Sequence, residues 1–359
     1  MRNFRSLLTL TASAIAVSGL LLTPQHSPAQ ETKAKAKGNN LIRSLADVQH
    51  DLKGKLDRIQ VHGKSLEGNL EGDAVDREVF VYLPPSYARD TGKRYPVVYM
   101  LHGYGLHAEQ WVGFINVAAA EKNSKEMIVV MPDAFTLFNG SFYSNSATTG
   151  DWEKFIAVDL VKYVDDHYRT KANRTSRGLG GHSMGGYGTF RIAMKYPEVF
   201  SSLYSMSAGG IFESGGVTPD LVRAESIKSK DEAAKLPYTQ KGPFARGAAW
   251  SANPQNPPFF LDLASKDGKV EERVAAKWMA NSLLVMLDQY DPALKKMKAL
   301  NMDVGLQDGL LRTNQQLDEA LTRAAVIHHF ETYEGDHNGK VPERFDTKVV
   351  AFFASQLEF

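Results

Sequence analysis

The sequence predicts an α/β fold built on a mostly parallel, doubly wound sheet. Short apolar segments alternate along the chain with segments that carry helical spacing, and this alternation implies parallel strands with helices on both faces. Two of the apolar segments, Tyr95–Leu101 and Met127–Met131, are apolar at nearly every position, which is typical of interior strands covered on both sides. The 359 residues, 43% hydrophobic and 23% charged, are enough for a sizeable core.

The first strands are expected to form an antiparallel hairpin. Ile59–Val61 and Arg77–Leu83 both have strand character, and glycines and acidic residues lie between them. In the second strand Phe80 and Tyr82 alternate with aliphatic residues, so the aromatic and aliphatic sets should face opposite sides of the sheet.

The rest of the chain continues the alternation, with one interruption. The expected elements are a helix at Phe155–Tyr168, the strand before Ser183, a helix at Gly185–Tyr196, strands at Ser201–Met206 and Leu300–Val304, a helix at Thr313–Ala325, a strand at His328–Tyr333 and a helix at Phe345–Leu357. Residues 207–299 break the pattern. They are predicted to be a cap-like insertion with two helices near 271–287, lying over the carboxyl edge of the sheet, where open α/β sheets bind ligands.

The N-terminus has the pattern of an export signal. Arg2 and Arg5 precede the apolar stretch Leu7–Leu22, and small residues follow at Ser27–Ala29. The alternative is a membrane anchor. However, the stretch is interrupted by hydroxyl-bearing residues, and it is shorter than the run of about 20 apolar residues that is needed to span a bilayer. We therefore expect a signal peptide over 1–29, a linker over 30–54, a hydrolase domain over 55–359, and a periplasmic or secreted protein that is not stably inserted in the membrane.

Charge and composition exclude several classes of function. Lys plus Arg number 42 and Asp plus Glu number 41, so no strong single-sign field attracts nucleic acid or anionic membranes. The absence of cysteine excludes thiolate catalysis, disulfides and thiolate metal sites. No metal-binding or phosphate-cradling motif is present, and no cofactor and no metal are expected.

The pentapeptide Gly181-His-Ser-Met-Gly185 is the centre of the predicted chemistry. A nucleophilic serine at the end of a strand needs a tight turn directly into a helix, and glycine two residues to either side prevents collisions in that turn. Ser183 is therefore the candidate nucleophile.

The nucleophile requires a base and an acid that orients the base. After Ser183 the histidines are His328, His329 and His337. The first two lie within the last expected strand and are predicted to be structural. His337 lies in a loop of glycines and small polar residues just beyond that strand, from which it can swing toward the serine, and it is the predicted base.

The predicted acid is Asp308, which lies past the end of the preceding strand and before a glycine turn. Asp303, within or near that strand, remains the alternative, and Asp262 and Asp267 in the insertion are more distant ones. The resulting order of serine, acid and histidine is that of the α/β-hydrolases.

The oxyanion hole is predicted to use two backbone N–H groups. One belongs to Met184, the residue after the nucleophile. The other is expected from Tyr104, in the loop that follows the strand ending at Leu101, with His102 bracing that loop.

Large aromatic residues are candidates for lining the substrate pocket. Trp111 and Trp250 are the two predicted to bind substrate, while Tyr143 and Trp152 are further possibilities; most such residues serve in packing. Asp133 ends a strand but precedes the serine, and it is predicted to be structural.

Three segments, Val79–Tyr87, Tyr95–Gly103 and Gly181–Gly188, carry a joint signature. Together they resemble the putative-esterase family, which contains esterase D, feruloyl and acetylxylan esterases, enterochelin esterases and antigen 85 mycolyltransferases. The resemblance implies an α/β-hydrolase fold and the same triad of serine, acid and histidine. Gly178 and Gly180 stand where family members usually carry larger apolar residues, which predicts a loosely packed serine strand.

The function predicted from the sequence is an exported serine carboxylesterase acting through an acyl-enzyme on a small-molecule or carbohydrate ester, of acetyl or feruloyl type. The alternatives are an acyltransferase of the mycolyltransferase type and a non-enzymatic binding protein on a hydrolase scaffold. Hydrolysis of S-formylglutathione, which the family also includes, is disfavoured by the export signal.

Overall fold

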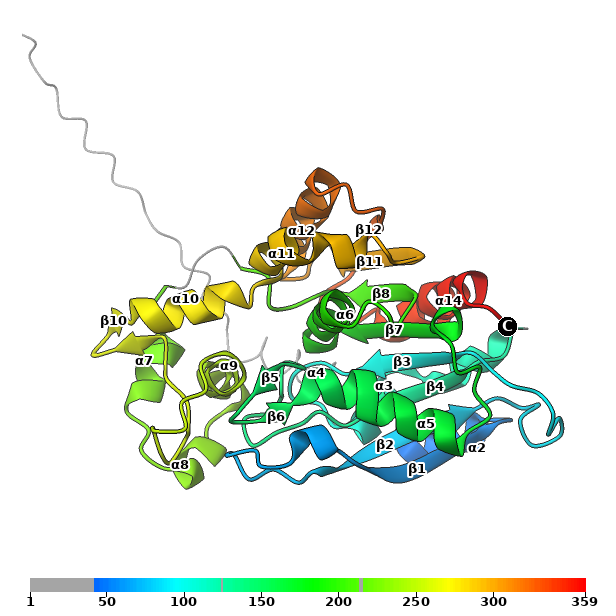
Figure 1. The fold of residues 1–359 in the computed structure, drawn as a ribbon, viewed down its shortest axis with the longest axis horizontal. Helices are drawn as coiled ribbons and strands as arrows, with labels where there is room; N and C mark the ends of the chain where they lie inside the picture. The colour runs from blue at the N-terminus through cyan, green and yellow to red at the C-terminus, as the bar shows by residue number, and fades with distance from the viewer. Residues whose placement is uncertain (1–41, 124, 213–215) are drawn as a thin grey trace, which may run out of the picture. The chain divides into compact units, whose positions relative to one another are not determined.

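A computed structural model describes residues 42–123, 125–212 and 216–359. The described chain is built on an eight-stranded sheet with the strand order β1-β2-β4-β3-β7-β8-β11-β12 (Figure 1). The strands are β1 (Lys55–His62), β2 (Asp76–Leu83), β3 (Val97–Leu101), β4 (Ile128–Pro132), β7 (Arg177–His182), β8 (Ser202–Met206), β11 (Ala299–Gly305) and β12 (His329–Tyr333). β1 pairs antiparallel with β2, and β2 pairs antiparallel with β4. From β4 to β12 the pairing is parallel, which confirms the predicted sheet.

Helices connect the strands and cover the sheet. The longer ones are α2 (Leu45–Asp51), α3 (Ala108–Ile115), α5 (Val161–His167), α6 (Met184–Lys195), α7 (Pro219–Glu225), α9 (Gly242–Trp250), α10 (Glu272–Ala280), α11 (Leu283–Leu294), α12 (Leu311–Arg323) and α14 (Val350–Gln356). Shorter elements are η1 (Lys64–Leu66), η2 (Val117–Lys122), α4 (Trp152–Lys154), η3 (Phe155–Leu160), η4 (Arg174–Ser176), α8 (Lys230–Ala234), η5 (Tyr238–Lys241), α13 (Val341–Arg344) and η6 (Phe345–Val349). Two short hairpins are β5 (Asn145–Ser146) with β6 (Gly150–Asp151), and β9 (Ser265–Lys266) with β10 (Lys269–Val270).

The two faces of the sheet carry separate hydrophobic cores. The aliphatic residues of β2 pack on the face covered by η3, α5, α6, α11 and α12. Phe80 and Tyr82 of the same strand pack on the face covered by α2, α3, α13, η6 and α14. The alternation predicted for this strand therefore separates the two layers, because successive side chains of a strand point to opposite faces.

The serine strand β7 is closely packed, and the prediction of loose packing is wrong. A Cβ on Gly178 would lie 2.5 Å from Cδ1 of Phe353, and a Cβ on Gly180 would lie 3.0 Å from both Sδ of Met100 and the carbonyl oxygen of Tyr204. The C-terminal helix α14 thus fills the space that larger side chains on β7 would otherwise occupy.

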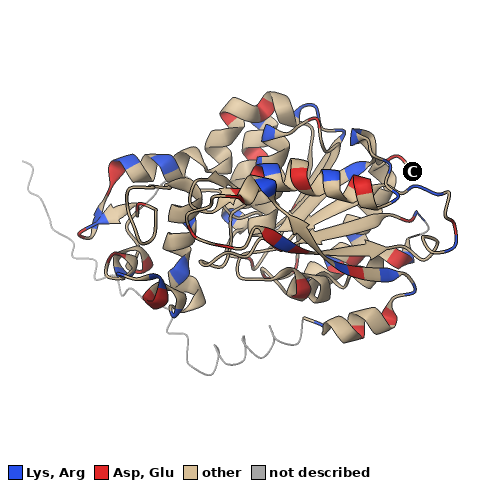
Figure 2. Cartoon of the chain, turned by 60° about the horizontal axis from the view of Figure 1, so that its bottom comes forward, with Lys and Arg blue, Asp and Glu red and all other residues tan. Residues whose placement is uncertain are grey.

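The chain between β8 and β11 contains α7, α8, η5, α9, the β9–β10 hairpin, α10 and α11. Figure 1 shows α7 to α10 on the side toward which β3 and β8 point, beyond their carboxyl ends. Lysines and arginines are interspersed with acidic residues over the described part of the chain (Figure 2). Among the described residues, none of the helices has the length and apolar character required to cross a bilayer.

Candidate active site

Ser183 occupies a sharp turn between β7 and α6. Its backbone has φ 57° and ψ −112°, a conformation that residues other than glycine rarely adopt. A Cβ on Gly181 would lie 2.5 Å from the carbonyl carbon and oxygen of Gly185, and one on Gly185 would lie 2.1 Å from the carbonyl oxygen of Leu101. Both glycines are therefore required by the close approach of backbone to backbone that exposes the serine.

Three side chains from distant parts of the chain form a hydrogen-bonded relay. The Oγ–H of Ser183 donates to Nε2 of His337 at 2.9 Å. The Nδ1–H of the same imidazole donates to Oδ2 of Asp308 at 2.8 Å. The carboxylate can only accept, so it holds the imidazole in the tautomer whose Nε2 can take the serine proton.

The carboxylate of Asp308 is buried, with 1% of its side chain exposed, whereas 32% of the side chain of His337 is exposed. Burial alone would raise the pKa of Asp308, but hydrogen bonds from His337 and from the amide of Leu310, at 2.8 Å, hold the pKa of its carboxyl below the usual range. The carboxylate therefore stays ionised at neutral pH.

Asp303, the alternative acid, is engaged elsewhere. Its carboxylate accepts hydrogen bonds at 2.8 Å from the hydroxyl of Tyr204 and at 2.9 Å from Nε of Arg344, and its side chain is fully buried. The ion pair with Arg344 ties β11 to α13, and this role leaves the orientation of His337 to Asp308.

The loop after β3 lies directly beside the serine. A Cβ on Gly103 would be 3.4 Å from Cβ of Ser183. Within the described chain, neither the amide of Tyr104 nor that of Met184 donates a hydrogen bond to a protein acceptor. Two unpaired N–H groups in the segments that flank a nucleophile are the usual composition of an oxyanion hole.

His102 fixes the conformation of this loop through two hydrogen bonds of its ring. Its Nε2 accepts a hydrogen bond from the amide of Ala134 at 2.8 Å, so Nδ1 carries the proton and donates to the carbonyl of Gly103 at 2.8 Å. That carbonyl shares a peptide plane with the amide of Tyr104, so His102 fixes the plane in which the Tyr104 N–H lies.

His182, which the sequence reasoning did not single out, holds the histidine loop. Its Nε2–H donates to the backbone carbonyl of His337 at 2.8 Å, and its ring stacks on Trp111. Complete burial, and then the nearby His337, lower the pKa of His182 to about 3, so the ring is neutral. The local sequence does not mark the second residue of the pentapeptide for this role. The contact joins residues 155 positions apart, so it could not be predicted from the sequence.

Replacement of His182 by glutamine should make stability less dependent on pH. Between pH 6.5 and 3 the unfolded chain binds a proton at His182 that the folded chain excludes, so the free energy of unfolding falls as the pH falls, by at most about 1.4 kcal/mol per pH unit. Urea unfolding at pH 4, 5, 6 and 7 should give a shallower slope for His182→Gln than for the wild type. Identical slopes would show that His182 is not a buried neutral histidine.

Residues 74–341 match the family described as putative esterase. The chain belongs to this family. Over 137 residues, 36% of this chain and 28% of the relative, it is 34% identical to an esterase of Mycobacterium tuberculosis. It is also 34% identical, over 37% of this chain and 19% of the relative, to an endo-1,4-beta-xylanase/feruloyl esterase of Xylanibacter ruminicola. The matches therefore span less than a third of the length of these relatives.

Solved structures share the fold of this esterase-family chain. A ferulic acid esterase superposes with a TM-score of 0.58 at 20% identity, covering 85% of this chain and 100% of that one. An S-formylglutathione hydrolase of Staphylococcus aureus superposes with a TM-score of 0.57 at 17% identity, covering 84% and 99%. These neighbours confirm the α/β-hydrolase architecture.

Trp111 does not line a pocket in this esterase-family fold, and that prediction is wrong. Its indole is fully buried and donates to the carbonyl of Met100 at 3.0 Å, so it supports His182 from within the core. Tyr143 and Trp152 are also fully buried.

Trp250 lies at the centre of an aromatic cluster beside the loop after β3. Its ring centroid is 4.8 Å from that of Phe142 and 5.7 Å from that of Phe212, and Phe142 stacks on Tyr104 at 6.0 Å. Trp250 is itself 6% exposed, whereas Phe142, Phe212 and Tyr104 are partly exposed. The exposed edge of the cluster is therefore formed by Phe142, Phe212 and Tyr104, and not by Trp250 itself.

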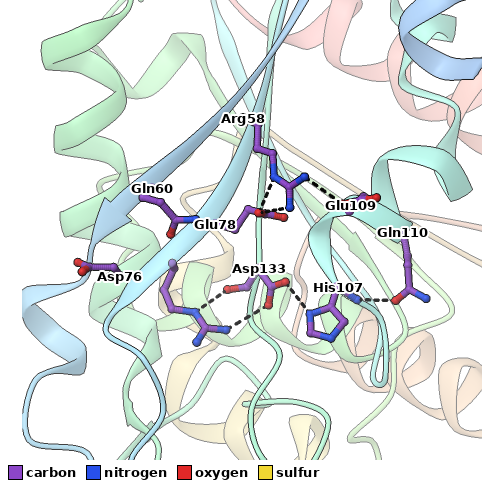
Figure 3. Close-up of a pocket in the computed structure, with 9 residues that line it drawn as sticks. Arg58, Gln60, Asp76, Glu78, His107, Glu109, Gln110 and Asp133 are labelled. Atoms are coloured by element: carbon purple, nitrogen blue, oxygen red, sulfur yellow. Dashed lines mark hydrogen bonds and ion pairs between the residues drawn. The ribbon is translucent and has the colours of Figure 1, made fainter. Parts of the chain in front are cut away.

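Asp133 belongs to a separate polar pocket of about 460 Å³ (Figure 3). Its carboxylate pairs with Arg77 at 3.1 Å and contacts Nδ1 of His107 at 2.9 Å. In the same pocket Arg58 pairs with Glu78 and Glu109 (Figure 3). Asp133 is thus bound by Arg77 of β2 and by His107 before α3, outside the relay of Ser183, His337 and Asp308, which fits the structural role that was expected.

The last two histidines before His337 also lie outside the relay. His328 contacts Asp318 through Nε2 at 2.8 Å and the carbonyl of Val326 through Nδ1 at 2.8 Å. His329 is exposed on β12.

Proposed function

We propose that the chain is a serine carboxylesterase that works through an acyl-enzyme, with Ser183, His337 and Asp308 as its catalytic residues. His337 takes the proton of Ser183 as Oγ attacks the ester carbonyl, and then returns it to the departing alcohol. Water, deprotonated by the same imidazole, attacks the acyl-enzyme and releases the acid, so that Ser183 recovers its proton.

The observation that carries this proposal is the relay itself. Oγ to Nε2 at 2.9 Å and Nδ1 to Oδ2 at 2.8 Å lie within the range in which a base can activate a nucleophile and an acid can orient the base. A binding protein on the same scaffold has no need for a strained serine backbone together with a buried carboxylate aligned on the imidazole.

The amides of Met184 and Tyr104 are proposed to stabilise the tetrahedral intermediate. Both belong to segments beside Ser183, and the His102 contact fixes the peptide that carries the Tyr104 N–H. Loss of one such donor typically costs roughly 3 kcal/mol of transition-state stabilisation.

The proposed substrate is a small or sugar-linked ester with an acetyl or hydroxycinnamoyl acyl group. The partly exposed edge of the aromatic cluster, formed by Tyr104, Phe142 and Phe212 around Trp250, suits a planar ring by stacking. The feruloyl esterase activity in the name of the Xylanibacter ruminicola relative supports the same choice.

We further propose export to the periplasm or the exterior. This rests on the charge and apolar pattern of residues 1–29, which lie outside the described residues, as do residues 30–41 of the proposed linker over 30–54. In the same proposal residues 55–359 form the hydrolase domain, with 207–299 as its insertion.

A fluorophosphonate probe and an ester panel test the function together. The probe should label Ser183, as identified by peptide mass spectrometry. The relative rates of hydrolysis of p-nitrophenyl acetate, methyl ferulate and S-formylglutathione should show which acyl group the enzyme prefers. Product analysis with added glucose or trehalose separates hydrolysis from acyl transfer. Failure of the probe to label Ser183 in the folded protein would favour a binding protein.

A further inference from the structure

Tyr238, at the start of η5, connects the segment between β8 and β11 to the loop after β3. Its hydroxyl donates to the backbone carbonyl of Tyr104 at 3.0 Å. The ring centroids of Tyr238 and Tyr104 are 5.0 Å apart. The contact joins residues 134 positions apart in the chain and reaches the residue whose amide is the proposed second oxyanion donor.

The ring of Tyr238 also rests on the backbone of Gly105. This glycine has φ +80°, and a Cβ there would lie 2.1 Å from Cε2 of Tyr238. The amide of Gly105 donates to the carbonyl of Asn139 at 2.8 Å. The peptide between Tyr104 and Gly105 is therefore held at both ends, at its carbonyl by Tyr238 and at its N–H by Asn139.

The peptide on the other side of Tyr104 is held at one end. The carbonyl of Gly103 accepts from His102, whereas the N–H of Tyr104 has no acceptor within the described residues. The free N–H thus lies in the peptide plane that His102 holds through the carbonyl of Gly103, and the next peptide plane along the chain is held by Tyr238.

We infer that Tyr238 is a positioning residue, which holds the amide of Tyr104 in the orientation needed to stabilise the oxyanion. The inference rests on the proposed esterase function. Oxyanion donors act over a narrow range of about 2.7–3.1 Å, so a small rotation of the peptide at Tyr104 weakens the donor without removing it. Tyr238 acts on the backbone of the loop and contacts no reacting atom.

The position of Tyr238 limits its contribution to folding. The residue as a whole is 53% exposed, although burial around its hydroxyl raises the pKa of Tyr238, and the hydroxyl makes one hydrogen bond, to a backbone carbonyl. Removal of the hydroxyl should therefore affect the catalytic rate more than the stability of the fold.

The test is Tyr238→Phe, which removes the hydroxyl and keeps the ring on Gly105. We expect kcat for p-nitrophenyl acetate to fall by about 3- to 10-fold, the equivalent of one hydrogen bond, with KM changed less than about 2-fold. Inhibition by phenylboronic acid, whose adduct with a serine hydroxyl is tetrahedral and anionic, should weaken by the same factor, and the midpoint of urea unfolding should not move. The matched control is Tyr290→Phe, on α11 in the same segment, which should behave as the wild type.

Each other result overturns the inference. An unchanged kcat and boronate affinity in Tyr238→Phe would show that the hydroxyl does not position the loop. A rise in KM alone would make Tyr238 a substrate contact, and a parallel loss of stability would make it a structural residue. These outcomes are distinct from failure of the proposed function, in which the wild type itself hydrolyses no ester of the panel and Ser183 is not labelled.

Discussion

Replacement of Ser183 by alanine is expected to reduce kcat for p-nitrophenyl acetate by on the order of 10⁴- to 10⁶-fold, the range for loss of the nucleophile of a serine hydrolase. Oγ is the atom that forms the acyl-enzyme, and alanine leaves His337 without a proton to accept. Because the side chain is at the surface of the turn and the glycines on both sides are retained, the free energy of unfolding should change by less than about 0.5 kcal/mol.

The measurement is steady-state hydrolysis together with urea unfolding. Ser226→Ala is the matched control, because Ser226 is an exposed serine that donates only to the carbonyl of Arg223, and this variant should retain full activity. Wild-type turnover in folded Ser183→Ala would disprove the assignment of the nucleophile.

Replacement of Asp308 by asparagine is expected to reduce kcat by about 10⁴-fold, as for other triads in which the acid becomes an amide. The amide NH₂ of asparagine would face Nδ1 of His337 and favour the tautomer that carries its proton on Nε2. In that tautomer Nε2 donates toward Ser183 and cannot remove its proton. The rate should fall while KM and the fluorescence of the folded protein change little.

Asp303→Asn is the control that distinguishes the two candidate acids. Asparagine there weakens one of the two carboxylate partners of Arg344, which keeps its ion pair with Glu331 at 3.0 Å, so the loss of stability should be smaller than the about 3–5 kcal/mol typical of a buried charge left without a partner. We expect Asp303→Asn to lower the urea midpoint while its folded fraction keeps activity within about tenfold of wild type, since its carboxylate does not contact the relay. The assignment of Asp308 is wrong if Asp308→Asn stays active and Asp303→Asn, still folded, does not.

Most of the sheet was predictable because its strands have local signatures. β3 and β4 are apolar at consecutive positions and are buried on both faces. The alternation in β2 separates Phe80 and Tyr82 from its aliphatic residues, and the structure places them in different layers. The helix α3 (Ala108–Ile115) was not predicted. It is only eight residues long, it follows the glycine-rich loop closely, and all but two of its residues are buried.

Two predictions failed for the same reason. The sequence shows that Trp111 is large and that Gly178 is small, but it does not show what packs against them. In the fold, Trp111 stacks on His182 inside the core, and Phe353, 175 positions further along the chain than Gly178, occupies the space above that glycine. Such contacts depend on which distant segments meet, and no local pattern records that.

The alternation of strands and helices, the glycine-flanked serine and the loop position of His337 can be read from the amino-acid sequence, because each depends on the steric and apolar demands of neighbouring residues. The three-dimensional arrangement was needed to show that the carboxylate of Asp308, and not that of Asp303, contacts the imidazole, and that His182 and Tyr238 hydrogen-bond to the two loops beside the serine. These are hydrogen bonds of about 3 Å between residues up to 155 positions apart, and their geometry exists only once the sheet has brought the carboxyl ends of its strands together.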